Sequence, residues 1–128
     1  MNFPDNLKYT KDHEWVKVDG DVATVGITEF AQQELGEIVF ADIPAVGKSF
    51  KQGETLCVVE STKAASDVYA PISGTVVEGN LALAASPDRI NTSSYADGWL
   101  VKLDKFDSGE LEKLMSAAEY KKHLGDKI

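Results

Sequence analysis

Arginine is almost absent from this 128-residue sequence, and acidic residues far outnumber basic ones. The chain has one arginine, 13 Lys+Arg and 21 Asp+Glu, which gives a net charge of −8. Nucleic-acid binders usually show the opposite balance or a basic stripe, so nucleic acid is not expected as a partner. The negative charge has two possible roles: it keeps a soluble protein dispersed, or it steers the protein toward basic surfaces of partner proteins. Composition alone favours the first.

Cysteine, histidine and long apolar runs are also scarce. The single cysteine, Cys57, excludes an internal disulfide, and its position within an apolar run predicts a buried small hydrophobe. The only histidines, His13 and His123, have no Cys or His neighbours at metal-ligand spacing, so we expect no metal site and a packed or capping His13. No apolar run reaches 18 residues, so no membrane-spanning helix is expected.

What the sequence does contain is a succession of short strand patterns. The length fits one domain, residues 1–128. Alternating apolar residues on both sides of Asp19-Gly20 predict a β-hairpin. Thr28 as N-cap and Gly36 as terminator predict a short helix between them.

The remaining patterns predict more strands and, at the C-terminal end, helix. The stretch 81–98 is turn-rich and predicts a long loop with one helical turn, whereas apolar spacing in 107–124 predicts two short helices, or one that bends near Ser116. Many short strands at close spacing indicate a mainly β fold, a small sandwich or flattened barrel. Further strands are predicted over 37–43, 54–60, 66–70, 74–78 and 99–103, the last with Trp99 in the core, as for Trp15.

Lys63 stands alone among small residues, Ser61, Thr62, Ala64 and Ala65, between two predicted strands. Most lysines on turns are simply solvated. A catalytic lysine is usually desolvated or close to another cation, and this turn supplies neither. Small neighbours do leave room for another enzyme to close over the amine. If Lys63 has a function, this setting favours the hypothesis that a cofactor is attached covalently to its amine.

The stretch "VESTKAASDVYAPISG" resembles the lipoylation segment of the glycine cleavage system H protein family. Further segments resemble that family in the same order, so the likeness covers nearly the whole chain. Thr62 and Ala64 stand where biotin carriers typically have methionines, which favours lipoate over biotin. The other segments are "LKYTKDHEWV" at 7–16, "VGIT" at 25–28, "LGEIVF" at 35–40, "GWLVKL" at 98–103 and "LMSAAEY" at 114–120.

The resemblance implies a lipoyl-domain fold of the barrel-sandwich hybrid type and a carrier, not an enzyme. Lipoate is expected on Lys63, attached by a lipoate ligase or lipoyl transferase. The implied partners are glycine decarboxylase, a pyridoxal-phosphate enzyme, then aminomethyltransferase and dihydrolipoyl dehydrogenase. The resemblance also implies a monomer. The start at Met1, without a secretory signal or an arginine-rich presequence, favours a bacterial cytoplasm over a mitochondrial matrix.

Two acidic residues match family positions expected to contact the loaded arm, Glu14 and Asp67. An ammonium that leaves bulk water needs an anionic or hydrogen-bonding partner, which either carboxylate supplies. The plainer alternatives are an exposed strand residue at Glu14 and a turn former at Asp67. Two other functions also stay open at this point: an H-like relay that donates lipoate to other complexes, and an unlipoylated interaction module.

Overall fold

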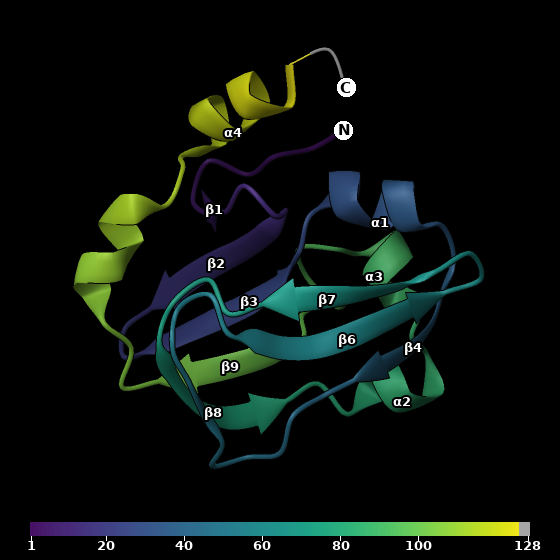
Figure 1. Ribbon diagram of the computed structural model, residues 1–128, viewed down its shortest axis with the longest axis horizontal. Coiled ribbons are helices and arrows are strands. Elements are labelled where there is room, and N and C mark those ends of the chain that lie inside the picture. Colours follow the sequence, from purple (N-terminus) through teal and green to yellow (C-terminus); the bar gives the residue numbers. More distant parts are fainter. Residues whose placement is uncertain (126–128) are drawn as a thin grey trace.

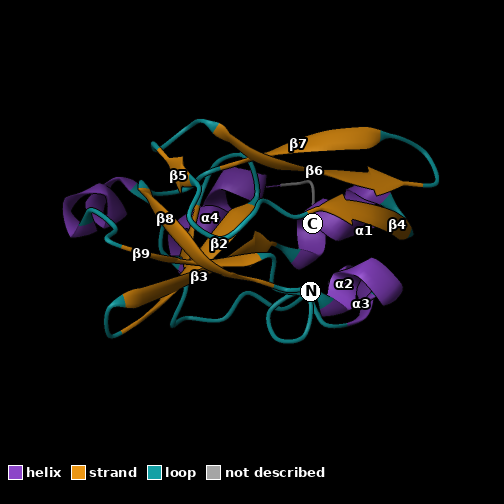
Figure 2. Ribbon diagram, turned by 90° about the horizontal axis from the view of Figure 1, so that it is seen from below, coloured by secondary structure: helices purple, strands orange, loops and turns teal. Residues whose placement is uncertain are grey.

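Two antiparallel sheets and several short helices make up the computed structural model, which describes residues 1–125 (Figures 1 and 2). The first half contains β1 (Lys8–Tyr9), β2 (Glu14–Asp19), β3 (Val22–Ile27), α1 (Glu29–Leu35), β4 (Ile38–Asp42), β5 (Ser49–Phe50) and β6 (Thr55–Ser61). The second half contains β7 (Ala65–Tyr69), β8 (Gly74–Gly79), α2 (Ala82–Ala85), α3 (Arg89–Thr92), β9 (Val101–Asp104), the 3-10 helix η1 (Ser108–Lys113) and α4 (Ala117–Leu124).

The strands form two layers that face one another. The six-stranded sheet has the order β1-β2-β3-β9-β8-β5, and the three-stranded sheet has the order β4-β6-β7. Figure 2 shows β6 and β7 in one layer and β3, β8 and β9 in the other. Inward residues of both layers are buried between them, which is the sandwich arrangement expected from the alternating pattern.

The predicted hairpin and helix caps are present. Asp19 pairs with Val22 across the β2–β3 turn, where Gly20 has a φ of 63°. The Thr28 side chain accepts a hydrogen bond from the Ala31 amide and so caps α1, which ends at Gly36. These local signals were sufficient because each acts within a few residues.

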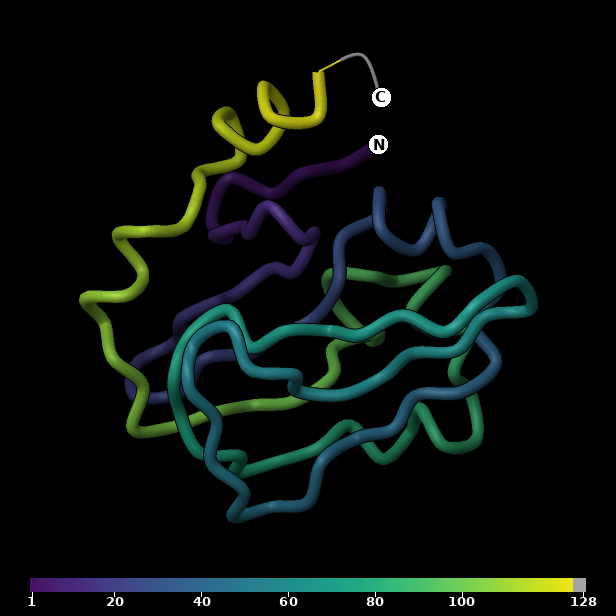
Figure 3. The backbone as a smooth tube through the Cα atoms, viewed as in Figure 1, coloured from purple at the N-terminus to yellow at the C-terminus, as the bar shows by residue number. Residues whose placement is uncertain are grey.

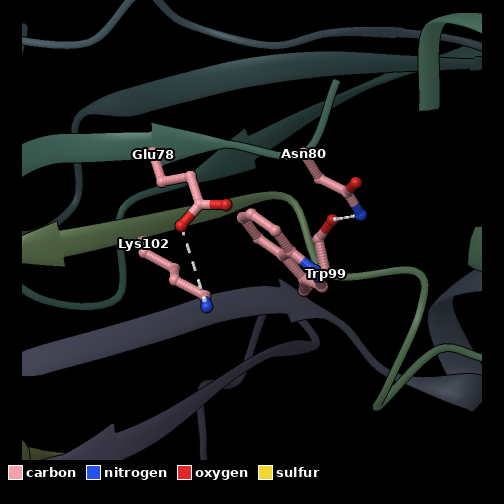
Figure 4. Close-up of polar contacts among 4 residues, drawn as sticks. All are labelled: Glu78, Asn80, Trp99 and Lys102. Carbon is pink, nitrogen blue, oxygen red and sulfur yellow. Dashed lines mark hydrogen bonds and ion pairs between the residues drawn. The ribbon is translucent and has the colours of Figure 1, made fainter. Parts of the chain in front are cut away.

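Residues 81–98 differ from the prediction of a loop with one helical turn. Two four-residue helices lie there, α2 and α3, and their apolar residues Leu83 and Ile90 are buried against the three-stranded sheet. The buried Asn80 amide donates to the Trp99 carbonyl (2.8 Å), which fixes the chain just before β9 (Figure 4). Beside it, the exposed pair Glu78–Lys102 at 3.8 Å contributes little stability.

The C-terminal region forms two helices, as one of the two predicted alternatives had it. Ser116 and Glu119 make a capping box at the start of α4. Tyr120 on α4 stacks on Tyr9 of β1, with ring centroids 4.8 Å apart. This contact joins the last helix to the first strand, and Figure 3 shows the helix at 117–124 (yellow) beside the N-terminal segment (purple). Within residues 1–125, no helix combines the length and apolar character needed to cross a membrane.

Candidate functional site

Lys63 lies on the turn between β6 and β7, at the tip of a hairpin that projects from the three-stranded sheet (Figure 1). Ser61 shapes the turn, because its Oγ accepts hydrogen bonds from the amides of Lys63 and Ala64, both at 3.1 Å. The Ser61 amide in turn donates to the Ala64 carbonyl (2.8 Å). These bonds hold the turn without covering it, and the Lys63 side chain is exposed.

The stem of Lys63 rests against the end of α1. Gly36 ends that helix with a φ of 85°, and a Cβ placed on it would lie 3.1 Å from Lys63 Cε. The Thr62 amide donates to the Glu37 carbonyl (3.0 Å), which ties the turn to the residues that precede β4. Among the described residues, the Lys63 ammonium has no ion pair with a carboxylate. The amine is therefore presented outward on a fixed support.

Glu14 has the opposite environment, since its side chain is only 2% exposed. Its carboxyl accepts hydrogen bonds from Thr10 Oγ1 (2.5 Å) and from the Tyr69 amide (3.2 Å). Burial raises the pKa of Glu14 from 4.5 to about 7, with a smaller contribution from Asp12, while the two hydrogen bonds oppose the shift. The pKa of Glu14 is therefore raised toward the neutral range, and Glu14 is not the exposed strand residue of the plainer alternative.

The turn that leads into Glu14 is conformationally strained. His13 has a φ of 75°, a left-handed conformation that costs a non-glycine residue roughly 1–2 kcal/mol. Its Nδ1 lies 2.8 Å from the Tyr120 hydroxyl, and its ring packs 4.8 Å from that of Phe30. These contacts hold the turn in place, and they confirm the packed role predicted for His13.

A cavity of about 350 Å³ opens beside Glu14 and is lined also by Thr10, Asp12, Tyr69 and Ala70. Its lining mixes apolar residues with charged ones, including Lys11 and Lys113, and contains a carboxyl group of raised pKa, a feature that marks ligand sites. A larger cavity of about 610 Å³ lies at the far end of the molecule, near the β2–β3 turn. We place the candidate site at the smaller one, because the larger cavity contains none of the predicted site residues.

Asp67 lies on the exposed strand surface between Lys63 and the cavity. It lies within β7 and pairs with Val58 of β6, so the strand predicted over 66–70 is confirmed and the plainer alternative of a turn former does not hold. At about 3.3 Å per strand residue, Asp67 is about 7 Å along β7 from Tyr69, whose amide donates to Glu14. The turn with Lys63 precedes β7, Asp67 lies within it, and Glu14 of β2 contacts its last residue.

Sequence reasoning missed the residues that set the properties of Glu14 and Lys63. Thr10 and Glu14 are four apart, and an Asx/ST-turn search of "TKDHE" could have found that contact. The Tyr69 amide comes from 55 residues away, and no local signal predicts it. The predicted burial of Cys57 is confirmed at 5% exposure, and burial raises the pKa of its thiol to about 12. No group of three or more metal-ligating side chains exists in residues 1–125.

The fold and the hairpin together define a class of protein: a small, mainly β barrel-sandwich fold that presents one lysine at the tip of a hairpin. A model of the family described as glycine cleavage H-protein matches residues 7–127. The chain belongs to that family.

Known relatives agree with this assignment over nearly the whole chain. A glycine cleavage system H protein of Halothermothrix orenii is 54% identical over 124 residues, covering 97% of each chain. One of Caulobacter vibrioides is 53% identical and covers 93% of this chain and 98% of its own. The crystal structure of a glycine cleavage system H protein from Mycobacterium marinum superposes with a TM-score of 0.87 at 38% identity, covering 96% of this chain and 99% of that one.

Proposed function

We propose that this protein is a lipoylated carrier of the glycine cleavage system, with lipoate in amide linkage to Lys63, and not itself an enzyme. It would carry the aminomethyl group from glycine decarboxylase to the aminomethyltransferase, and then electrons to dihydrolipoyl dehydrogenase. The observation that carries the proposal is the exposed Lys63 on a turn held by Ser61. Membership of the H-protein family supports lipoate as the group attached there.

The residues around Lys63 fit an attached arm. Thr62, Ala64 and Ala65 are small and exposed, so they leave the amine open to an acylating enzyme. Gly36 supports the stem from one side without a side chain of its own. Lipoate supplies the sulfur chemistry when it is attached, and the contribution of this chain is to present, orient and shelter it.

Intact mass measures the attachment directly. The purified protein is incubated with a lipoate ligase, lipoate and ATP, and we expect the mass of one lipoyl group to be added. Lys63→Arg keeps the charge and should abolish the increment, whereas the matched control Lys51→Arg, on another exposed turn, should keep it. An increment that survives in Lys63→Arg would place the group elsewhere, and none in the unmodified sequence would refute lipoylation.

We also propose that Glu14 and Asp67 shelter the loaded arm. Glu14 lines the cavity at the far end of β7, and Asp67 stands on the path toward it. A cationic amine that enters the cavity gains a carboxylate partner there. Hydrolysis of the loaded arm should be faster in Glu14→Gln and in Asp67→Asn; unchanged rates in both variants would reject the assignment.

Reconstitution with glycine decarboxylase distinguishes a carrier that takes part in glycine cleavage from a protein that only donates lipoate to other complexes. With lipoylated protein and glycine decarboxylase, we expect glycine-dependent exchange of carbon dioxide that requires Lys63. A protein that accepts lipoate but supports no exchange would instead be a donor of lipoate to other complexes.

A further inference from the structure

Two adjacent apolar side chains are exposed on β4 near the lysine turn. Val39 is 49% exposed and Phe40 is 50% exposed, while Ile38 and Ala41 on either side are buried. An irregularity in the β4–β6 register between Ile38 and Phe40 breaks the alternation and turns both side chains outward. Single exposed hydrophobic residues are ordinary, but a valine and a phenylalanine together form a patch that calls for a partner.

This patch is fixed next to Lys63. Phe40 pairs with Glu60, the last residue but one of β6, and Thr62 is tied to the Glu37 carbonyl. In Figures 1 and 2, β4 lies beside β6 at the hairpin end of the molecule. Any protein surface that closes over the lysine turn therefore meets β4 as well.

The patch also has a charged surround. Directly paired residues of a sheet share a face, so Phe40 and Glu60 point outward together, as do Asp42 and Asp67 one pair further along. Segments 34–46 and 58–69 contain five acidic residues, and their only basic residue is Lys63: the acids are Glu34, Glu37, Asp42, Glu60 and Asp67. A partner of this surface would carry an apolar socket for Phe40 and a basic rim.

We propose that Val39, Phe40 and the exposed acid Asp42 of β4 form a docking surface for the enzyme that acylates Lys63. This inference rests on the proposed function, that is, on lipoate being attached there. The turn itself offers only Ser, Thr and Ala side chains, which give an enzyme little to distinguish it from any other exposed lysine turn. Specific recognition must therefore come from the surface next to the turn.

The short reach of the bare lysine side chain favours the acylating enzyme as the partner that covers this surface, rather than the enzymes that act on the lipoylated lysine. To be acylated, the bare Lys63 amine must reach the enzyme's reacting carbon with only its own stem, so the surfaces around the turn are covered. Enzymes that act on the arm's far end reach it from further away and need not cover β4.

In the acylation, the Lys63 nitrogen forms a bond to the carbonyl carbon of an activated acyl donor such as an acyl adenylate. The bond to the adenylate breaks, AMP leaves, and the amine proton passes to a base of the enzyme.

Steady-state acylation by a lipoate ligase, with this protein as the varied substrate, tests the proposal. We expect Phe40→Ser and Val39→Ser to raise the KM for the carrier by roughly tenfold with kcat nearly unchanged, since the loss falls on docking. The matched control Val18→Ser, which removes a similarly exposed (42%) strand valine far from the turn, should change KM less than about twofold. Thermal unfolding of each variant shows that the fold is kept.

The same acylation assay tests the contribution of negative charge independently. Asp42→Asn should raise the KM for the carrier, and the exposed control Glu112→Gln on η1 should not. Added salt should raise the KM of the unmodified protein and narrow the difference between its KM and that of Asp42→Asn, because the Debye length falls from about 10 Å at 0.1 M to about 3 Å at 1 M.

The outcomes separate the two proposals. If the unmodified protein accepts no acyl group, the proposed function fails, and this inference fails with it. If it is acylated but Val39→Ser, Phe40→Ser and Asp42→Asn show unchanged KM values, only the docking surface is refuted. With NAD⁺ as the electron acceptor, the dihydrolipoyl form of Phe40→Ser should be oxidised to the disulfide by dihydrolipoyl dehydrogenase with unchanged KM; an equal loss in that reaction would refute the assignment to the acylating enzyme.

Discussion

Replacement of the Glu14 carboxyl by an amide, Glu14→Gln, should change how the stability of this protein depends on pH. The carboxyl is 2% exposed and accepts hydrogen bonds from Thr10 and from the Tyr69 amide. Burial is the largest cause of its raised pKa, about 7 against the ordinary 4.5. Glutamine has nearly the same shape, accepts from the Tyr69 amide and donates to Thr10, and it cannot ionise.

The magnitude and sign follow from linkage. A shift from 4.5 to about 7 is roughly 2.5 pKa units, which at about 1.4 kcal/mol per unit gives about 3 kcal/mol. Between these two pH values the folded state holds more protons at Glu14 than the unfolded state, so the free energy of unfolding falls as pH rises. The contribution is complete below about pH 4.5, and it is lost as pH rises through the folded pKa near 7.

Urea denaturation of both proteins at several pH values measures this term. Every other titrating group is common to the two, so the difference in free energy of unfolding isolates Glu14. We expect the free energy of unfolding of Glu14→Gln, taken relative to that of the unmodified protein, to rise by about 3 kcal/mol from about pH 4 to about pH 8. A difference that stays constant within about 0.5 kcal/mol over that range, or a Glu14 carboxyl whose NMR titration midpoint is ordinary, would refute the account.

The other predictions concern the packing that supports the site. Gly26→Ala should destabilise the protein by at least about 1–3 kcal/mol in urea denaturation, because the new Cβ would lie 2.6 Å from the Trp15 ring; stability within 0.5 kcal/mol of the unmodified protein would mean that the ring moves at no cost. Tyr120→Phe removes the hydroxyl that bonds Thr28 and His13, and a loss of about 1–3 kcal/mol is expected by the same method, whereas no loss would show that water replaces it. Ser116→Ala breaks the capping box of α4 and should cost about 0.5–2 kcal/mol, with Ser116→Gly costing less; equal losses would argue against a capping role.

Much of the fold was predictable because its signals are local. The Asp19-Gly20 hairpin and the helix between Thr28 and Gly36 depend on turn and cap residues that act over two to four positions. The two-residue strand β5 was not predicted, since Ser49 and Phe50 become a strand only by pairing with β8, 24 to 26 residues later. Likewise α2 and α3 are too short for helical periodicity to be visible in the sequence.

The candidate site divides in the same way. The short interval between the two strands predicted on either side of Lys63 predicted a turn with an exposed lysine, and the structure shows both. The family resemblance added the hypothesis that this lysine carries lipoate. The properties of Glu14 could not be predicted, because its environment is assembled from β2, β7 and the turn at Thr10. Position in a motif identifies which carboxyl to examine, whereas only tertiary packing decides whether that carboxyl is ionised.

The raised pKa of Glu14 bears on how a carrier can shelter a cation reversibly. A permanently ionised carboxylate that is buried without a cationic partner would cost several kcal/mol of desolvation, and a permanently neutral one would attract an ammonium only weakly. A pKa raised to about 7 places Glu14 between these extremes at neutral pH. A cationic group that entered the cavity would lower that pKa and so favour the carboxylate, and the pKa would rise again when the cation left. Under the proposed function, Glu14 would bind the loaded arm in preference to the unloaded arm, without a change in the backbone.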